Sequence, residues 1–175
     1  TEEKINYLLE MRASGRDRCE DYADKFGVPF YKGEKPWGIK VDIAMPCATQ
    51  NEIGIKEAKQ IIANGTKYYI EVANMPTTEE ALNFLIDRND VIVATSKAVN
   101  AGGVCVSGLE MSQNSQRLSW TAEEVDEKLH NAMINIHKHS VEAAEKYGLG
   151  YDLVAGANIA GFEKVAEAMM AQGIY

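Results

Sequence analysis

The sequence predicts an α/β protein that contains half of a doubly wound parallel sheet, followed by a segment of long helices. Short apolar runs at 40–48, 68–72 and 91–95 are bounded by turn residues, and helical patterns at 55–65 and 77–90 separate them. Strands that alternate with helices at this spacing are typical of βαβ units. The first half of the chain is therefore expected to build a parallel sheet.

Long helices dominate the second half, with patterns at about 100–117, 122–147 and 153–172. In the middle helix, side chains at helical spacing predict one buried face: Val125, Leu129, Ala132, Met133, Ile136, Ser140 and Ala144.

Local signals predict several helix ends. At the amino terminus, Ile5, Leu8 and Leu9 share one face of a first helix, and a second helix over 18–25 should end at Gly27. A threonine followed three residues later by glutamate predicts a capped helix start. This pattern occurs at Thr49 and Glu52, Thr77 and Glu80, and Thr121 and Glu124.

Length and composition favour one soluble domain over 1–175, with βα units in 1–95 and the helical segment in 96–175. A net charge of −8 disfavours nucleic-acid and anionic-membrane partners. The three cysteines are widely spaced and form no metal-binding or disulfide pattern. With no signal-peptide pattern at the amino terminus, we expect a cytoplasmic protein.

Three segments follow the predicted strands at their carboxyl ends: 45–52, 73–80 and 95–103. Ligands of open α/β sheets bind at this edge. Small residues and amides in all three loops suit a planar ligand, although turns are commonly rich in the same residues.

Gly102 and Gly103 precede a helical stretch with Ser107 one turn further on. This arrangement could hold a carboxylate at the start of a helix. Alternatively, the glycines allow close packing, and Ser107 bonds back to its own helix.

Other candidates are weaker. Arg12, Arg16 and Arg18 could clamp a phosphate or form a solvated loop. His130, His137 and His139 are interpreted as helix-surface residues because they lack ligand spacing. The glycine fingerprint of dinucleotide-binding folds does not occur in the sequence.

The segments 42–52, 73–81, 97–114 and 156–173 together resemble, in the same order, the carboxyl-terminal part of bacterial hexameric glutamate dehydrogenase. The resemblance implies a partial Rossmann-like nucleotide-binding domain. It also implies a parent enzyme that converts L-glutamate to 2-oxoglutarate and ammonia with a nicotinamide dinucleotide, as a homohexamer. The catalytic lysine and aspartate of that family would lie outside this chain.

The resemblance also assigns roles to individual residues. Ser107 and Val104 are similar to the residues that meet the side-chain carboxylate and the stem of glutamate. Asn100 is similar to the asparagine that faces the nicotinamide carboxamide, and Asn74 to the one that touches the nicotinamide ribose.

Cys47 and Ala48 resemble small residues near the adenosine ribose. Val72 stands where the family usually has glycine, and a β-branched residue would resist a left-handed backbone. Basic residues near the amino-terminal stretch favour NADP over NAD: Arg12, Arg16 and Arg18.

Three interpretations follow. The first is a piece of an NADP-dependent glutamate dehydrogenase, inactive when isolated because its catalytic groups are missing. The second is a non-enzymatic nucleotide- or partner-binding module from a split gene. The third is a related dehydrogenase for branched or aromatic amino acids, against which Ser107 argues because a hydroxyl suits a dicarboxylate. In each case the incomplete sheet is expected to expose a strand edge at 41–45 or 91–95 and to promote self-association.

Overall fold

The computed structural model describes residues 1–16 and 18–173, and the chain divides into two compact units, Thr1–Pro36 and Trp37–Tyr175. The assignment of 1–175 to a single nucleotide-binding domain stays a prediction. Each unit is described on its own below.

The smaller unit consists of two helices, α1 (Glu2–Ala13) and α2 (Cys19–Phe26). They pack through aromatic rings: the ring of Tyr7 meets that of Phe26 edge-on, with centroids 5.5 Å apart. The second helix ends at Gly27 in the left-handed conformation (φ 61°), as predicted. The predicted apolar face of α1 exists but remains exposed: Ile5, Leu8 and Leu9.

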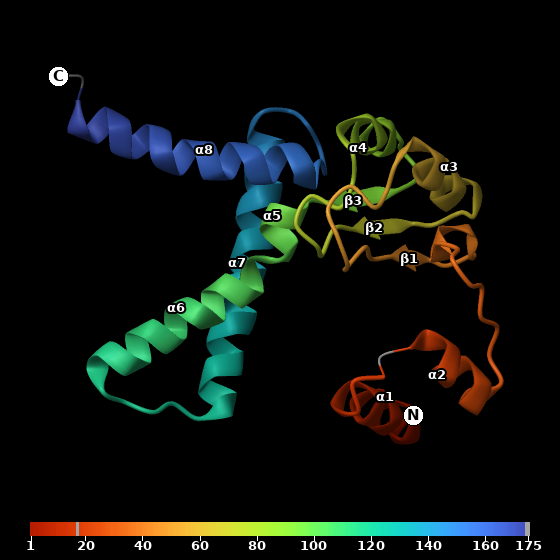
Figure 1. Ribbon diagram of the computed structural model, residues 1–175. Helices are drawn as coiled ribbons and strands as arrows, with labels where there is room; N and C mark the ends of the chain where they lie inside the picture. The colour runs from red at the N-terminus through yellow and green to blue at the C-terminus, as the bar shows by residue number, and fades with distance from the viewer. Residues whose placement is uncertain (17, 174–175) are drawn as a thin grey trace. The chain divides into compact units, whose positions relative to one another are not determined.

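The larger unit contains a parallel sheet in the order β1-β2-β3, which confirms the predicted fold class (Figure 1). After a 3-10 turn (Pro36–Gly38), the elements are β1 (Ile43–Ala44), α3 (Ile55–Ala63), β2 (Tyr68–Ile70), α4 (Glu79–Ile86) and β3 (Ile92–Ala94). Helices α3 and α4 lie side by side over the sheet. The strands are shorter than the apolar runs that predicted them.

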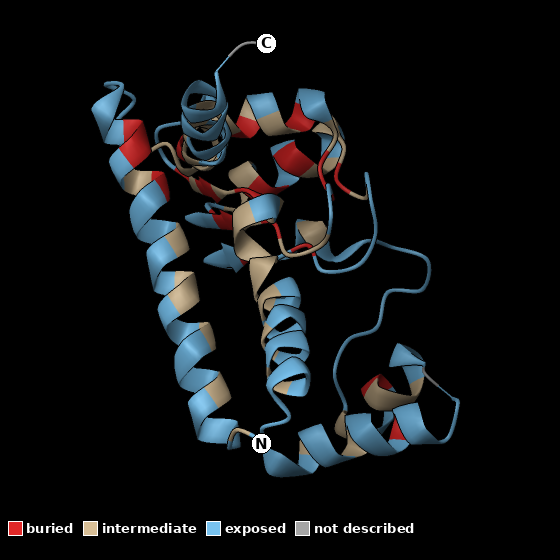
Figure 2. Ribbon diagram, turned by 90° about the vertical axis from the view of Figure 1, so that its left-hand side faces the viewer, coloured by how far each residue is buried: buried red, intermediate tan, exposed pale blue. Residues whose placement is uncertain are grey.

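The core lies between this sheet and these helices, where Figure 2 shows the buried residues concentrated. Ile61 of α3 and Leu85 of α4 pack with Tyr69 of β2, which is fully buried. Small residues at Ala58 and Ala81 are fully buried as well. Removing these apolar side chains from water holds the sheet and its two helices together.

The helical segment contains α5 (Ser96–Val99), α6 (Ala101–Gln116), α7 (Ala122–Lys146) and α8 (Leu153–Gln172). The predicted stripe on α7 is confirmed, since all seven of its residues are half-buried or buried; Val141 and Ala143, which were not predicted, are also shielded. Helices α7 and α8 pack closely and are also linked by Glu163, which accepts hydrogen bonds from Lys146 Nζ at 2.5 Å and Tyr147 Oη at 3.0 Å. Within the described residues, no helix is long and apolar enough to cross a bilayer.

Of the three predicted capping boxes, one is confirmed. Thr121 accepts from the Glu124 backbone N–H at 3.2 Å, and Glu124 accepts from that of Thr121 at 2.7 Å. The box at Thr49 and Glu52 is wrong as a helix start, because that segment is a turn and α3 begins later, behind Gly54.

The box at Thr77 and Glu80 is also wrong, because Thr78 precedes α4 and the Thr77 side chain is buried instead. Its hydroxyl lies 2.6 Å from the hydroxyl of Tyr69. A partner in the core has therefore replaced the local cap.

Candidate functional site

The three predicted loops leave the sheet at one edge because all three strands are parallel. Backbone hydrogen bonds tie them together. Val72 and Ala73 both donate to the carbonyl oxygen of Pro46, at 3.1 and 2.9 Å, and Glu71 donates to that of Ala94 at 3.0 Å. The carboxyl edge is thus a connected surface, although part of the third predicted loop forms the short helix α5.

Two asparagines from different loops meet at this edge. Asn100, between α5 and α6, donates its side-chain amide to the amide oxygen of Asn74 at 2.6 Å. Asn74 follows β2 and is exposed, whereas Asn100 is half-buried. The bond leaves an amide oxygen on Asn100 and an amide NH₂ group on Asn74, which is the set of groups that a carboxamide ligand requires.

The first turns of α6 present a small, open surface. A methyl group on Gly103 would meet no atom within 4 Å, whereas one on Gly102 would lie 3.4 Å from Leu129 of α7. The side chain of Val104 is 73% exposed. The hydroxyl of Ser107 donates to the carbonyl oxygen of Gly103 at 3.2 Å, which is the helix back-bond considered above as the alternative.

The loop after β1 places Cys47 and Ala48 in exposed positions, with Cys47 Sγ 3.2 Å from the carbonyl oxygen of Met45. The departure at Val72 causes no backbone strain, because Val72 does not have a positive φ. The left-handed residue of the neighbouring loop is Met75, with φ 47°. Valine is therefore compatible with this strand end.

The three arginines belong to the smaller unit. Arg12 lies in the last turn of α1, and Arg18 precedes α2. Arg16 forms an ion pair with Asp21 at 3.0 Å. This contact engages one of the three cations with a carboxylate of the same chain.

Two buried polar features near the edge escaped the sequence analysis. Glu71 is only 2% exposed, and its carboxylate accepts the backbone N–H of Ser96, at the start of α5, at 3.1 Å. Beside it on β2, burial raises the pKa of Tyr69 well above its ordinary value, against the smaller opposing effect of the hydrogen bond with Thr77. A charged residue at the end of an apolar strand was the available signal for Glu71.

A small apolar cavity of about 120 Å³ lies behind α5. Among the residues that line it are Thr95, Ala98, Met133, Ile136, His137 and Leu153. Its walls come from β3, α5, α7 and α8. It is too small for a nucleotide, and pockets for such ligands have volumes of several hundred Å³.

The histidines show no metal-binding arrangement. His137 Nε2 lies 2.7 Å from the hydroxyl of Tyr151, which links α7 to the segment before α8. Within residues 1–16 and 18–173, no group of three His, Cys, Asp or Glu side chains could hold a metal ion.

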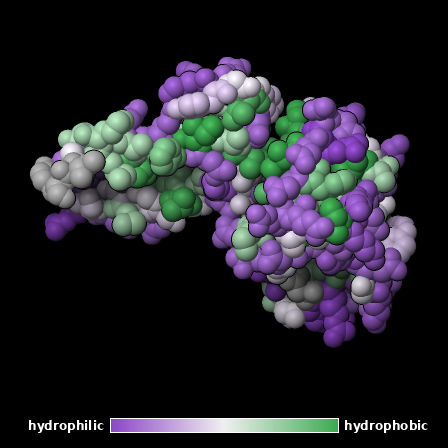
Figure 3. Space-filling view, turned by 90° about the horizontal axis from the view of Figure 1, so that it is seen from above, coloured by the Kyte–Doolittle hydropathy of each residue, from purple (hydrophilic) through white to green (hydrophobic). Residues whose placement is uncertain are grey.

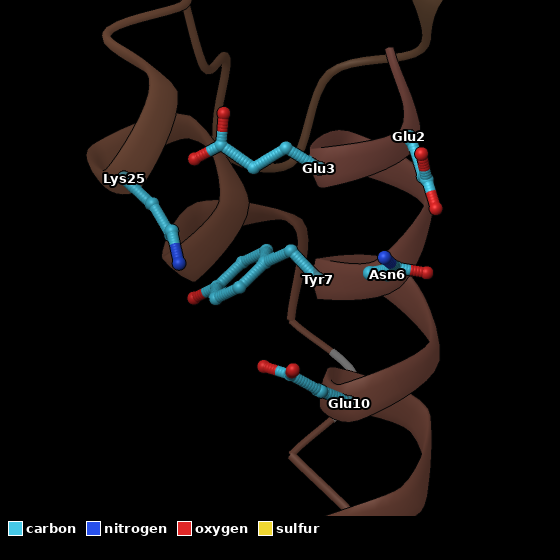
Figure 4. A pocket seen from close by; sticks show the side chains of 6 residues that line it. All are labelled: Glu2, Glu3, Asn6, Tyr7, Glu10 and Lys25. Carbon is cyan, nitrogen blue, oxygen red and sulfur yellow. The ribbon is translucent and has the colours of Figure 1, made fainter.

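The smaller unit has an acidic depression of about 380 Å³, shown in Figure 4. Lys25 Nζ lies 4.3 Å from the ring centre of Tyr7. The remaining lining residues are Glu2, Glu3, Asn6 and Glu10. Three carboxylates against one ammonium would repel a phosphate, so this depression does not suit a nucleotide.

Comparison with known proteins identifies relatives along almost the whole chain. An NAD-specific glutamate dehydrogenase of Clostridium symbiosum is 72% identical over 174 residues, which cover 99% of this chain and 39% of that protein. An NADP-specific glutamate dehydrogenase of Escherichia coli is 52% identical over 174 residues, 99% of this chain and 38% of that protein. A solved structure of glutamate dehydrogenase aligns with a TM-score of 0.95 at 72% identity, covering 99% of this chain and 39% of that one.

The chain thus spans about two fifths of the length of these relatives. The profile of the glutamate/leucine/phenylalanine/valine dehydrogenases matches residues 2–173. The parallel sheet with flanking helices of this chain agrees with the solved structure. This chain belongs to the glutamate/leucine/phenylalanine/valine dehydrogenase family.

Proposed function

We propose that this chain supplies the nicotinamide and substrate contacts of a glutamate dehydrogenase, in which L-glutamate, water and an oxidised nicotinamide dinucleotide yield 2-oxoglutarate, ammonia and the reduced dinucleotide. The observation that carries this proposal is the pairing of Asn74 and Asn100 at the carboxyl edge of the sheet. The family membership and the glutamate dehydrogenase names of the relatives support it.

The paired amides fit the nicotinamide end of the cofactor. Asn100 would bind the carboxamide and Asn74 the neighbouring ribose, while open space at Gly103 lets the ring approach the start of α6. When bound, the nicotinamide accepts a hydride from the substrate carbon. Cys47 and Ala48 would line the adenosine ribose from the loop after β1.

Substrate contacts would come from α6. Ser107 would exchange its bond to the Gly103 carbonyl for a charge-assisted bond to the side-chain carboxylate of glutamate. Val104, exposed one turn earlier on the same helix, would contact the methylene stem. The side chain of a leucine, valine or phenylalanine substrate offers no acceptor to Ser107, so glutamate is the better match within this family.

The choice of dinucleotide rests on one observation that favours NADP and two that oppose it. The basic group of Arg12, Arg16 and Arg18 favours NADP, whose 2′-phosphate requires cations. Against this, Arg16 is already paired with Asp21, and a relative 72% identical to this chain bears the name NAD-specific. We favour NAD, and comparing kcat/KM for NAD and NADP in the hybrid protein described below tests both alternatives.

The alternative of a non-enzymatic module was favoured by Val72 and by the missing glycine fingerprint. Val72 no longer favours it, because this residue does not distort the strand end. The isolated chain is still expected to be inactive, since the family's catalytic lysine and aspartate would lie outside it. The decisive test therefore joins this chain to the amino-terminal three fifths of the Clostridium symbiosum relative, giving a hybrid of full family length.

In this hybrid, Ser107→Ala should lower kcat/KM for L-glutamate roughly 10- to 100-fold, the value of a hydrogen bond to a charged group. Ser112→Ala is the matched control. Ser112 lies five residues further along α6, so that it faces another direction, and it is also exposed and bonds back to its own helix, to the Gly108 carbonyl at 2.9 Å. Equal effects of the two substitutions, or an inactive hybrid, would contradict the proposed function.

A further inference from the structure

Four residues at the carboxyl edge are joined by three hydrogen bonds, and the backbone from Glu71 to Asn74 closes them into a ring. The Glu71 carboxylate accepts the backbone N–H of Ser96 at 3.1 Å, and the Ser96 carbonyl accepts that of Asn100 at 2.9 Å. The Asn100 side chain then donates to Asn74 at 2.6 Å. Asn74 follows Glu71 by three residues on the same loop, which completes the ring.

Glu71 is the buried member of this ring. A carboxylate that is 2% exposed is costly to hold unless it is hydrogen-bonded. Its partner, the first N–H of α5, has no acceptor within its own helix. The bond therefore satisfies both groups and holds the start of α5 against the end of β2.

Asn100 lies one helical turn beyond this contact. Helix α5 has only one turn, Ser96–Val99, and Asn100 follows directly at its end. A shift of Ser96 would therefore be transmitted through a single turn to the Asn100 amide. Because Asn74 and Asn100 come from different loops, their 2.6 Å contact requires both loops to keep their positions.

We propose that Glu71 is a positioning residue for the nicotinamide site, which acts through Ser96 to hold the amide of Asn100 against Asn74. The role in cofactor binding rests on the proposed function above. The role in positioning does not, because all four residues belong to the larger unit and the ring is complete without a ligand.

The first experiment uses this chain without any ligand and follows the side-chain amide signals of Asn74 and Asn100 by NMR. Glu71→Leu removes the acceptor, and Ser96→Pro removes the donor. Proline is tolerated at the first position of a helix, and the ψ of 146° at Thr95 suits a following proline. Both substitutions should shift the two amide signals and speed hydrogen exchange at the Asn100 backbone N–H at least about tenfold.

Matched variants distinguish a loss of Asn100 positioning from a general loss of stability. Glu71→Gln keeps an acceptor oxygen and Ser96→Ala keeps the N–H, so both should retain the native signals. Thr77→Val breaks a different buried polar contact, that between Thr77 and Tyr69 of β2, which lies outside the ring. It should lower the melting temperature without moving the amide signals of Asn74 and Asn100. Unchanged signals in Glu71→Leu, or an equal shift in Thr77→Val, would overturn the proposal.

The second experiment measures cofactor binding in the hybrid dehydrogenase. Glu71→Leu should weaken binding of the nicotinamide dinucleotide roughly tenfold and leave binding of ADP, which lacks nicotinamide, unchanged. Parallel losses for both ligands would overturn the positioning role. A hybrid that is inactive even with Glu71 in place would instead contradict the proposed function, and the NMR experiment would still decide the positioning of Asn100.

Discussion

Tyr69 and Thr77 form a buried polar contact in place of the helix cap that the local sequence predicts. Thr77 has the sequence pattern of a helix cap, yet its hydroxyl lies 2.6 Å from that of Tyr69 in the core. Tyr69 is fully buried, and its hydroxyl would lose hydrogen bonding if Thr77 turned outward. Leaving such a group without a partner costs about 1–3 kcal/mol, comparable to or more than a typical helix cap contributes.

The same burial predicts a dependence of stability on alkaline pH. Because burial raises the pKa of Tyr69 in the folded chain, the unfolded chain loses this proton first as the pH rises above about 10. Tyr69 should therefore lower the free energy of unfolding by up to about 1.4 kcal/mol per pH unit in that range, and contribute no slope below it.

Urea unfolding between pH 8 and 11 measures this effect. Tyr69→Phe should flatten the decline above pH 10 relative to the unsubstituted chain. Tyr68→Phe, which changes the exposed neighbour on the same strand, should preserve it. A decline that survives in Tyr69→Phe would show that other groups cause it.

At the scale of elements, the contact between α7 and α8 depends on one glycine. A methyl group on Gly156 would lie 1.9 Å from the carbonyl oxygen of Ser140 and 3.2 Å from the side chain of Ala144. The two helix backbones approach so closely here that any side chain would force them apart. Ser140 and Ala144, on the buried stripe of α7, form the other side of this contact.

Gly156→Ala is therefore expected to reduce the free energy of unfolding by at least about 2 kcal/mol, the cost of overpacking a tight contact. Gly161→Ala is the control on the same helix, because a methyl group there meets no atom within 4 Å. Its gain in helix propensity should leave stability unchanged or raise it by up to about 1 kcal/mol. Thermal unfolding followed by circular dichroism compares the two variants. Similar losses of stability in both would contradict the role of Gly156 in the contact between α7 and α8.

At the scale of the whole molecule, large apolar side chains remain exposed on several elements. Figure 3 shows apolar residues along α8, where Phe162, Val165, Met169 and Met170 are exposed. The edge strand β1 exposes Ile43 and, just beyond it, Met45. Both predicted strands lie at edges of the three-stranded sheet, and the more exposed apolar side chains are at β1, because Val91 and Val93 are each only 8% exposed.

An exposed apolar edge strand predicts self-association at high concentration. Ile43→Lys places an ammonium group on β1 and should weaken self-association at least about tenfold, since pairing would then bury a charge. Met111→Lys, on the exposed surface of α6, adds the same charge away from the sheet and should have little effect. Sedimentation velocity over a range of concentrations measures both, and a monomer at every concentration would contradict the prediction.

Features that depend on neighbouring residues could be predicted before the structure was known. The alternation of strands and helices, the left-handed Gly27, the Thr121 cap and the buried stripe of α7 all follow from spacing over a few residues. The loops of the candidate site were predicted for the same reason, because parallel strands bring their carboxyl ends to one edge.

The pairs of groups that meet across that edge became known from the folded structure. Glu71 and Ser96 are 25 residues apart, and Asn74 and Asn100 are 26 apart, so no local pattern indicates either pair. Thr77 forms its contact with Tyr69 and not the predicted helix cap, and Gly156 packs against Ser140. Both contacts arise because packing sets the distance between elements that are far apart in the sequence. These contacts depend on the shape of the assembled core, which spacing along one element does not specify.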